Sequence, residues 1–287
     1  MAKTTRTMSP VIAVHGGCGR WASADAARAL RGVRAAAQTG RRMLEEGASA
    51  LDAVCAAVVQ LEDDPLFNAG TGSALNSEGE AEMDASVMVG KELRCGGVAA
   101  LKRVKNPVLV ARRVMQITPH VLLAGEGALA FARRCGFEDH DPAAGRRARA
   151  ARLGTVGAVA LDATGELAAA TSTGGTAMKM PGRIGDSPIP GAGNYATPFA
   201  AASATGTGEL MMRFLAAKAV CDRIACGETP CDAVQSIVEA LPVGNAQGAA
   251  LIALDASGRL GFFARGGRLP HAWHCAGEAR VRGRMSP

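Results

Sequence analysis

Aromatic residues are scarce in this chain of 287 residues: Phe, Trp and Tyr together make up 3% of it. Proteins that bind single-stranded nucleic acids stack bases on aromatic side chains, so the sequence lacks the platform for that function. It also lacks any apolar run near the ~18 residues that a membrane span needs. The opening stretch MAKTTRTMSP has no apolar segment of the kind found in signal peptides, so we expect a cytoplasmic protein without membrane partners.

Charge and cysteine narrow the possible functions further. The net charge is +6, but four arginines lie within residues 146–152, a short polar segment that we interpret as a solvated linker and not as a nucleic-acid site. Without a signal peptide, the eight cysteines are predicted to be free thiols. The cysteines at 221, 226 and 231 recur every five residues, a spacing that no common zinc site uses and that suits helices and their boundaries.

Glycine is abundant, at 36 residues, and together with many alanines it favours closely packed layers of strands and helices. In the first half, short apolar runs predict strands at 11–15, 82–89 and 97–101. Apolar residues at helical spacing predict helices at 23–46, from a cap at Ser49 to Pro65, at 106–116 and at 125–135. Residues 137–154 are charged, contain Pro and Gly and show no strand alternation, so we expect a mobile linker.

The second half repeats the pairing of like elements. Strands are predicted at 155–162 and 166–173, joined by Ala-Thr-Gly as a hairpin, and again at 248–255 and 259–265. Between them lie a Gly/Pro-rich loop at 174–193, a long helix at 207–227 and a Thr229-capped helix at 231–241. Because strands and helices each come in pairs, the order favours sheets packed face to face with helices outside, over the alternation of a doubly wound sheet.

Thr155 is the most informative residue of the second half. It follows Gly154 at the junction between the predicted linker and the first strand of the hairpin. If the chain is cut before Thr155, one residue carries a hydroxyl nucleophile and a free α-amine that acts as its base. The ordinary pKa of such an amine, about 7.7–8.0, suits general-base work near neutral pH.

Candidates for the other parts of such a site follow along the chain. Thr173 ends the second strand of the hairpin, so its hydroxyl can lie opposite Thr155 and orient it. The run Thr-Gly-Thr-Gly-Glu at 205–209 leads into a helix, whose open N–H groups favour developing negative charge. Arg183 and Asp186 offer one cation and one anion, which together suit the head group of an amino acid.

Each of these features also has an ordinary structural interpretation. A Gly-Thr pair can simply begin a strand, an Arg and an Asp three residues apart can form a surface ion pair, and the 205–209 run can be only a helix cap. That run is not a phosphate loop, because the chain contains no Gly-x-x-x-x-Gly-Lys-Ser/Thr pattern. His15 fits a hydrogen-bonded residue at a strand end, and the five histidines suggest no Ser/His/Asp triad.

Taken together, the segments are far more specific. The chain resembles the plant-type asparaginase and isoaspartyl peptidase family of N-terminal nucleophile hydrolases from residue 11 to about 255. The matching stretches are His15-Gly16-Gly17, LEDDPLFNAGTGSALNSEGEAEMDASVM (61–88), TPHVLLAGEGA (118–128), GTVGAVALDATGELAAATSTGG (154–175), PGRIGDSPIPGAGNYA (181–196) and ATGTGE (204–209).

The resemblance implies an α+β fold, a four-layer αββα sandwich made as an inactive precursor. The precursor would cut itself between Gly154 and Thr155 into an α subunit (1–154) and a β subunit (155–287), and two such pairs would assemble. The implied site residues are Thr155 as nucleophile, Thr173 as its partner, Thr205 with Gly206 as oxyanion hole, Asn68 near Thr155, and Arg183 and Asp186 on the substrate, beside Gly208.

The resemblance also implies an activity and an ion. The enzyme would release L-aspartate from L-asparagine, with ammonia, and from β-aspartyl dipeptides through a threonine acyl-enzyme, without a catalytic cofactor. A structural sodium ion would be held, mostly through carbonyl oxygens, by Leu61, Glu62, Asp64, Phe67, Ala69 and Thr71. Such oxygen-rich loops suit hard cations.

One stretch departs from the family pattern. After the last predicted strand pair the family shows a turn of the type Phe-Asn-Thr-x-Gly-Met, whereas residues 263–269 read FARGGRL and add two cations. Two alternatives stay open. One is a relative acting on glycosylated asparagine or on aspartyl sites in proteins. The other is a non-enzymatic homologue that has lost processing and only binds amino acids or acidic peptides.

Overall fold

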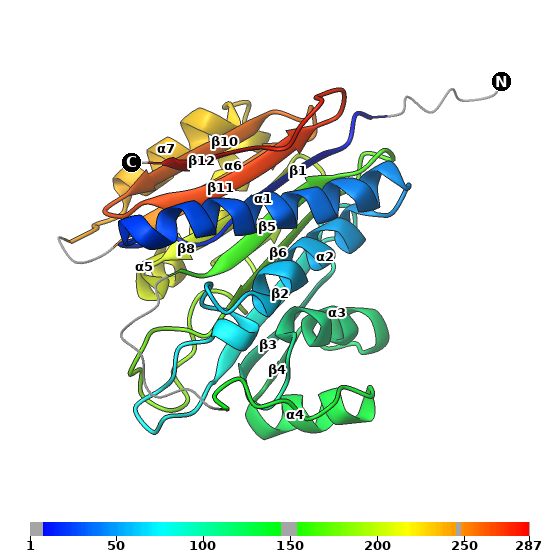
Figure 1. Cartoon of the computed structure of the whole chain (residues 1–287). Helices are drawn as coiled ribbons and strands as arrows, with labels where there is room; N and C mark the ends of the chain where they lie inside the picture. The colour runs from blue at the N-terminus through cyan, green and yellow to red at the C-terminus, as the bar shows by residue number, and fades with distance from the viewer. Residues whose placement is uncertain (1–7, 145–153, 245–247, 287) are drawn as a thin grey trace.

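The computed structural model describes residues 8–144, 154–244 and 248–286, which form two β-sheets flanked by helices (Figure 1). In spatial order the larger sheet contains β12 (Arg282–Ser286), β11 (Leu269–Cys275), β1 (Val11–His15), β5 (Val156–Leu161), β6 (Leu167–Thr173), β2 (Met83–Val89), β3 (Cys95–Leu101) and β4 (Leu122–Ala124). The smaller sheet contains β10 (Leu260–Arg265), β9 (Ala249–Asp255), β8 (Ala200–Gly206) and β7 (Asn194–Ala196).

Helices cover the outer faces of the two sheets. The larger sheet packs against α1 (Ser23–Glu45), α2 (Ala50–Asp63), α3 (Pro107–Ile117) and α4 (Gly125–Arg134), with the 3₁₀ turn η1 (Gly70–Gly72) after α2. The smaller sheet packs against α6 (Ala216–Ala225) and α7 (Pro230–Ala240), and the short helix α5 (Gly208–Phe214) precedes them. No helix in the described ranges is long and apolar enough to cross a membrane.

Apolar residues form a core between the larger sheet and its helices, a second core between the two sheets, and a third between the smaller sheet and its helices. The central strands are buried throughout because both of their faces are covered. Along β5, Val156 and Ala158 belong to the core beneath α1–α4, whereas Val159 and Leu161 belong to the core between the sheets. Ile252 of β9 meets them from the smaller sheet. Because side chains alternate between the faces of a strand, a sheet covered on both faces needs nearly continuous apolar runs. The many alanines keep these layers thin.

The predicted mixture of helices and sheets is confirmed, as are the hairpin of β5 and β6 and the cap at Ser49, which forms a capping box with Asp52 on α2. All eight cysteines are free thiols, as predicted. The part of the predicted linker at 145–153 lies outside the described residues.

The long helix predicted at 207–227 is wrong. The chain forms α5 and α6 instead, because Leu215 adopts a left-handed conformation with φ of 45° that ends one helix and begins the next. Sequence patterns also missed β4, β7, β8, β11 and β12. The run AAASATG of β8 shows why, since alanine favours helices and only burial between two layers makes this segment a strand.

Candidate active site

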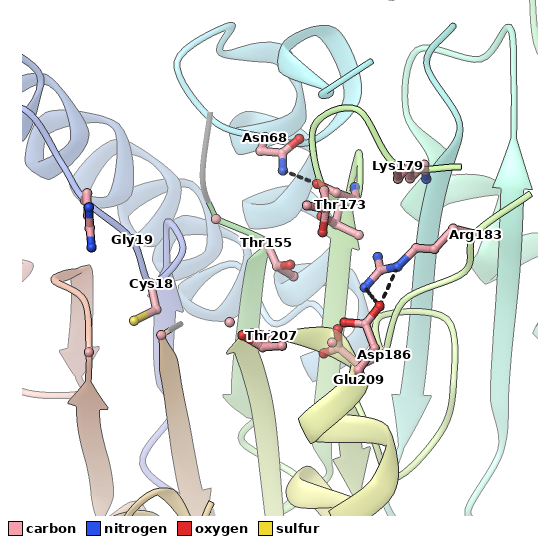
Figure 2. A pocket seen from close by; sticks show the side chains of 18 of the residues that line it. Cys18, Gly19, Asn68, Thr155, Thr173, Lys179, Arg183, Asp186, Thr207 and Glu209 are labelled. Carbon is pink, nitrogen blue, oxygen red and sulfur yellow. Dashed lines mark hydrogen bonds and ion pairs between the residues drawn. The ribbon is translucent and has the colours of Figure 1, made fainter. Parts of the chain in front are cut away.

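Thr155 and Thr173 meet at one end of the hairpin between β5 and β6. Val156 pairs with Ser172 in this antiparallel ladder, so Thr155 and Thr173 occupy the next position on either strand. Both are buried, at 7% and 3% exposure, and both line a cavity of about 440 Å³ (Figure 2). The Thr173 hydroxyl also accepts a hydrogen bond from the Gly175 N–H at 3.0 Å, which fixes the turn after the strand. The predicted proximity of the two threonines is therefore confirmed.

Asn68 comes from the loop after α2 and closes the same corner. Its side-chain Nδ2 donates to the Gly175 carbonyl at 2.7 Å, and its Oδ1 accepts from the Ala74 N–H at 2.7 Å. Its own carbonyl accepts from the Gly174 N–H at 2.9 Å. These bonds join the loop of Asn68 to the turn that follows Thr173, and the residue lines the cavity beside Thr155 (Figure 2).

Arg183 and Asp186 belong to the loop between β6 and β7, and both line the cavity. The Arg183 guanidinium donates from Nε and Nη2 to Glu209 Oε1, at 3.0 and 2.8 Å (Figure 2). Asp186 is buried, its Oδ2 has no hydrogen-bond partner among the described residues, and burial raises its pKa to about 7, against the opposing effect of Arg183. The cation and the anion predicted for a substrate head group are thus brought together.

Gly208 makes this approach possible at the start of α5. A Cβ atom on Gly208 would lie 2.8 Å from Arg183 Nη2 and 2.9 Å from Asp186 Oδ1. Any larger residue would push the two charged groups away from the helix end. The family-based expectation that Gly208 belongs beside the clamp therefore has a steric explanation.

Thr205 and Gly206 end β8 at the base of the cavity. Gly206 lines the cavity and has φ of 139°, a conformation that side chains oppose. Thr205 is fully buried behind the wall, where its Oγ1 accepts a hydrogen bond from the Cys18 N–H at 3.1 Å. The structure thus brings Gly206 to the cavity surface and Thr205 to the layer immediately behind it.

The glycines of the His15-Gly16-Gly17 stretch pack against the predicted cleavage site. Gly154 has φ of 120° and lies directly on Gly17, which has φ of 99°. His15 is fully buried and its Nε2 hydrogen-bonds to Ser203 Oγ at 2.9 Å, which confirms the structural role predicted for it. Burial lowers the pKa of His15 to about 3, so the ring is neutral at physiological pH.

Two buried charges near the clamp escaped the sequence analysis. Asp84 of β2 accepts hydrogen bonds from the N–H groups of Ala100 and Gly185, at 2.8 and 3.0 Å, and burial raises its pKa. Lys179 lines the cavity and donates from Nζ to the Glu82 carbonyl at 2.7 Å, and burial lowers its pKa. The only available signal was an acid inside a buried apolar strand, which requires fixed partners.

The six residues expected to bind sodium run from the last turn of α2, through the turn that follows it, into η1. The Asp64 carbonyl accepts from the Phe67 N–H, and the Ala69 carbonyl accepts from the Gly72 N–H. A Cβ atom on Gly70 would lie 2.6 Å from the Glu62 carbonyl oxygen, so the chain folds back and brings Gly70 against the end of α2. The Glu62 carboxyl points elsewhere, since its Oε1 accepts from the Ser172 hydroxyl and the Val108 N–H.

The turn that departs from the family pattern borders the cavity. Gly266 lines it, whereas the Arg265 side chain turns away and donates from Nη1 to the Glu239 carbonyl at 3.0 Å, near the end of α7. Arg268 forms an isolated antiparallel bridge with Gly19. Arg265 therefore caps a helix, whereas Arg268 adjoins the segment that lines the cavity.

Comparison with known proteins gives a consistent result. A family model described as asparaginase matches residues 8–150 and 143–280. The plant-type L-asparaginase of Thermococcus kodakarensis is 42% identical, with 88% of this chain and 92% of that protein aligned. The isoaspartyl peptidase of Escherichia coli is 41% identical, with 95% of each chain aligned, and the human isoaspartyl peptidase/L-asparaginase is 45% identical, with 77% and 79% aligned. The resemblance inferred from the motifs is confirmed: the chain belongs to the asparaginase family and is a hydrolase.

Proposed function

We propose that this protein is a self-cleaving threonine hydrolase that releases L-aspartate from L-asparagine and from β-aspartyl dipeptides. The observation that carries the proposal is the arrangement of Thr155 and Thr173 across a cavity from Arg183 and Asp186. The nucleophile and a pair of opposite charges thus line the same cavity. The names of the three relatives, which specify asparaginase and isoaspartyl peptidase, support the same two substrates.

Processing comes first in the proposed sequence. The Thr155 hydroxyl attacks the Gly154 carbonyl, the peptide C–N bond breaks, and the acyl group moves from nitrogen to oxygen. Water then hydrolyses the ester, leaving the Gly154 carboxylate at the end of an α subunit (1–154) and a free amine on Thr155 at the start of a β subunit (155–287). Gly154 supports this step, because its positive φ holds the scissile bond in a conformation that other residues disfavour.

Turnover then uses the chain's own groups. The Thr155 amine takes the hydroxyl proton, Oγ attacks the side-chain carbonyl of the substrate, and the oxyanion is stabilised by the Gly206 N–H, with the Thr205 hydroxyl in the layer behind it. The C–N bond breaks, and the amine returns the proton to the leaving ammonia or amino acid. Water attacks the acyl-enzyme and releases aspartate. Thr173 orients the nucleophile, Asn68 holds the adjoining turn, and Arg183 and Asp186 bind the α-carboxylate and α-ammonium groups.

Further properties of the family follow as part of the proposal. We propose that the layers of helices and sheets form the αββα sandwich of N-terminal nucleophile hydrolases. We propose that two αβ units assemble, that the enzyme is cytoplasmic, and that the turn at residues 61–71 holds a sodium ion. The Glu62 carbonyl oxygen beside Gly70 is a ligand of the type that suits a hard monovalent cation. Such an ion would stabilise the loop of Asn68, and no catalytic step passes through it.

Mass spectrometry of the purified protein tests the proposal. Fragments divided between Gly154 and Thr155 are expected, together with turnover of asparagine and β-Asp-Leu. The Thr155→Ala variant should stay intact and inactive, and Thr155→Ser should recover part of the cleavage. An unchanged chain that binds these ligands without turnover would favour the binding-only homologue. Faster turnover of glycosylated asparagine than of asparagine and β-Asp-Leu would favour a relative that acts on glycosylated asparagine.

A further inference from the structure

The cavity has two chemically different halves on either side of Thr155. Arg183, Asp186 and Glu209 lie on one side of the threonine, and Cys18 and Gly19 lie on the other (Figure 2). Both carboxylates among the described lining residues belong to the first half. The second half is formed by residues that adjoin β1 and the smaller sheet, namely Cys18, Gly19, Arg20, Gly248 and Gly266.

The proposed function, on which this inference rests, fixes which part of the substrate enters each half. With the α-carboxylate and α-ammonium groups held at Arg183 and Asp186, the side-chain carbonyl reaches Thr155. The leaving nitrogen must then point away from the clamp, towards Cys18 and Gly19. For asparagine that nitrogen becomes ammonia, and this half stays largely unused. For a β-aspartyl dipeptide it belongs to a whole amino acid, which must occupy this half.

Small residues leave room for such a leaving group. Gly19, Gly248 and Gly266 present no side chains, and the Cys18 thiol packs tightly beside the glycines: a Cβ atom on Gly248 would lie 3.0 Å from its Sγ. A cavity of about 440 Å³ falls within the range of roughly 300–1,000 Å³ found for small-molecule sites. The volume therefore leaves room for a dipeptide as well as for asparagine.

The fold fixes Arg20 at the edge of this half. The Gly19 N–H donates to the Arg268 carbonyl at 3.1 Å, and the Arg268 N–H donates to the Gly19 carbonyl at 2.9 Å. This bridge ties the segment before α1 to the turn at 263–269 that departs from the family pattern. As a result, Arg20 and Arg268 lie on neighbouring segments of the chain, and Arg20 lines the cavity.

We infer that Arg20 is a specificity-determining residue that binds the free α-carboxylate of the leaving amino acid. A leaving residue with a terminal carboxylate carries one negative charge into a half-cavity whose described lining offers a cation and no anion. A guanidinium matches a carboxylate with two parallel hydrogen bonds. The substrate class that this favours is β-aspartyl dipeptides with a free C-terminus, over asparagine and over β-aspartyl peptides whose C-terminus is blocked.

The test compares three substrates in two variants. The substrates are β-Asp-Leu, its C-terminal amide and L-asparagine. The first variant, Arg20→Met, keeps an unbranched side chain without its charge. The control, Arg28→Met, removes an exposed arginine on α1 that pairs only loosely with Asp25, at 3.8 Å. Intact cleavage before Thr155 is checked in both variants by mass spectrometry.

Arg20→Met is expected to lower kcat/KM for β-Asp-Leu about tenfold, the effect of losing one charge-assisted hydrogen-bonded pair. Its kcat/KM for asparagine and for the amide should change less than about twofold. Arg28→Met should leave all three unchanged. An equal loss for the acid and the amide, or no loss for the acid, would overturn the assignment of Arg20. If the unsubstituted protein turns over none of the three substrates, the proposed function itself fails.

Discussion

Gly17 lies so close to Gly154 that neither residue has room for a side chain. A Cβ atom on Gly154 would lie 2.6 Å from Gly17 Cα, and a Cβ atom on Gly17 would overlap the Gly154 backbone. Both residues also have positive φ values, of 99° and 120°. The segment that follows β1 therefore packs directly against the residue before Thr155, although the two segments are far apart in sequence.

Replacing Gly17 by alanine should slow self-cleavage by at least about tenfold, because a displacement near 1 Å at a reacting group is enough for a loss of this size. The time course of fragment appearance, followed by mass spectrometry, measures it. Gly47→Ala is the matched control: Gly47 has φ of 83°, but a Cβ atom there would meet nothing within 4 Å, so this variant adds backbone strain without a clash. Equal cleavage rates in the two variants would contradict the role of this contact.

Asp84 joins the nucleophile to the substrate clamp. It pairs with Thr173 across β2 and β6, and its carboxylate accepts from the N–H of Gly185, which lies between Arg183 and Asp186. Asp84→Asn keeps the shape of the side chain but removes the charge that fixes this loop. We expect KM for asparagine to rise about tenfold, the value of one hydrogen bond to a charged group.

Cleavage before Thr155 does not use the clamp, so it should proceed at its normal rate in Asp84→Asn. Asp25→Asn, at an exposed position on α1, serves as the control with normal KM and normal cleavage. If Asp84→Asn loses cleavage and turnover together, the residue serves general stability and not the position of the clamp.

Asp186 should make substrate binding depend on pH. Burial raises its pKa to about 7, so the carboxylate is charged above this pH and becomes neutral as the pH falls below it. The neutral form no longer attracts an α-ammonium group. KM for asparagine should therefore rise about tenfold between pH 8 and pH 6. Succinamic acid, which is asparagine without its amine, should show little change, and a parallel rise in its KM would exclude Asp186 as the cause.

Patterns in the sequence identified the parts of this site that local structure determines. The turn Ala-Thr-Gly between two apolar runs predicts the β5–β6 hairpin, and the hairpin alone places Thr155 opposite Thr173. Arg183 and Asp186 were identified from their types and spacing, and the structure brings both to the cavity. The Thr-Gly-Thr-Gly-Glu run before a helix already indicated a site for negative charge, and the family resemblance then singled out Thr205 and Gly206 within it.

The remaining features depend on contacts between distant segments. The position of Asp84 beside the clamp arises from the pairing of β2 with β6 and from a loop about a hundred residues later in the chain. Arg20 reaches the cavity because Gly19 pairs with Arg268 near the other end of the sequence. The break at Leu215 has no helix-breaking residue to announce it, since leucine is a strong helix former.

Ser203 provides the last test, because it links the two sheets through a buried polar chain. Its hydroxyl hydrogen-bonds to His15 Nε2 at 2.9 Å and to Thr171 Oγ1 at 2.8 Å, and all three residues are fully buried. Ser203→Ala leaves the imidazole nitrogen without this partner. The expected cost is about 1–3 kcal/mol of unfolding free energy, the penalty for one unsatisfied buried polar group.

Urea unfolding at pH 7.5 measures this cost under conditions that keep the ring neutral in both states. Burial lowers the folded pKa of His15 to about 3 from its ordinary 6.5, so the unfolded chain binds the extra proton only below pH 6.5. The stability that His15 contributes by remaining neutral is thus complete at pH 7.5 and is lost as the pH falls from 6.5 towards 3. Ser257→Ala, at an exposed turn, should cost less than about 0.5 kcal/mol. Equal stability of the two variants would mean that the polar chain does not stabilise the contact between the sheets.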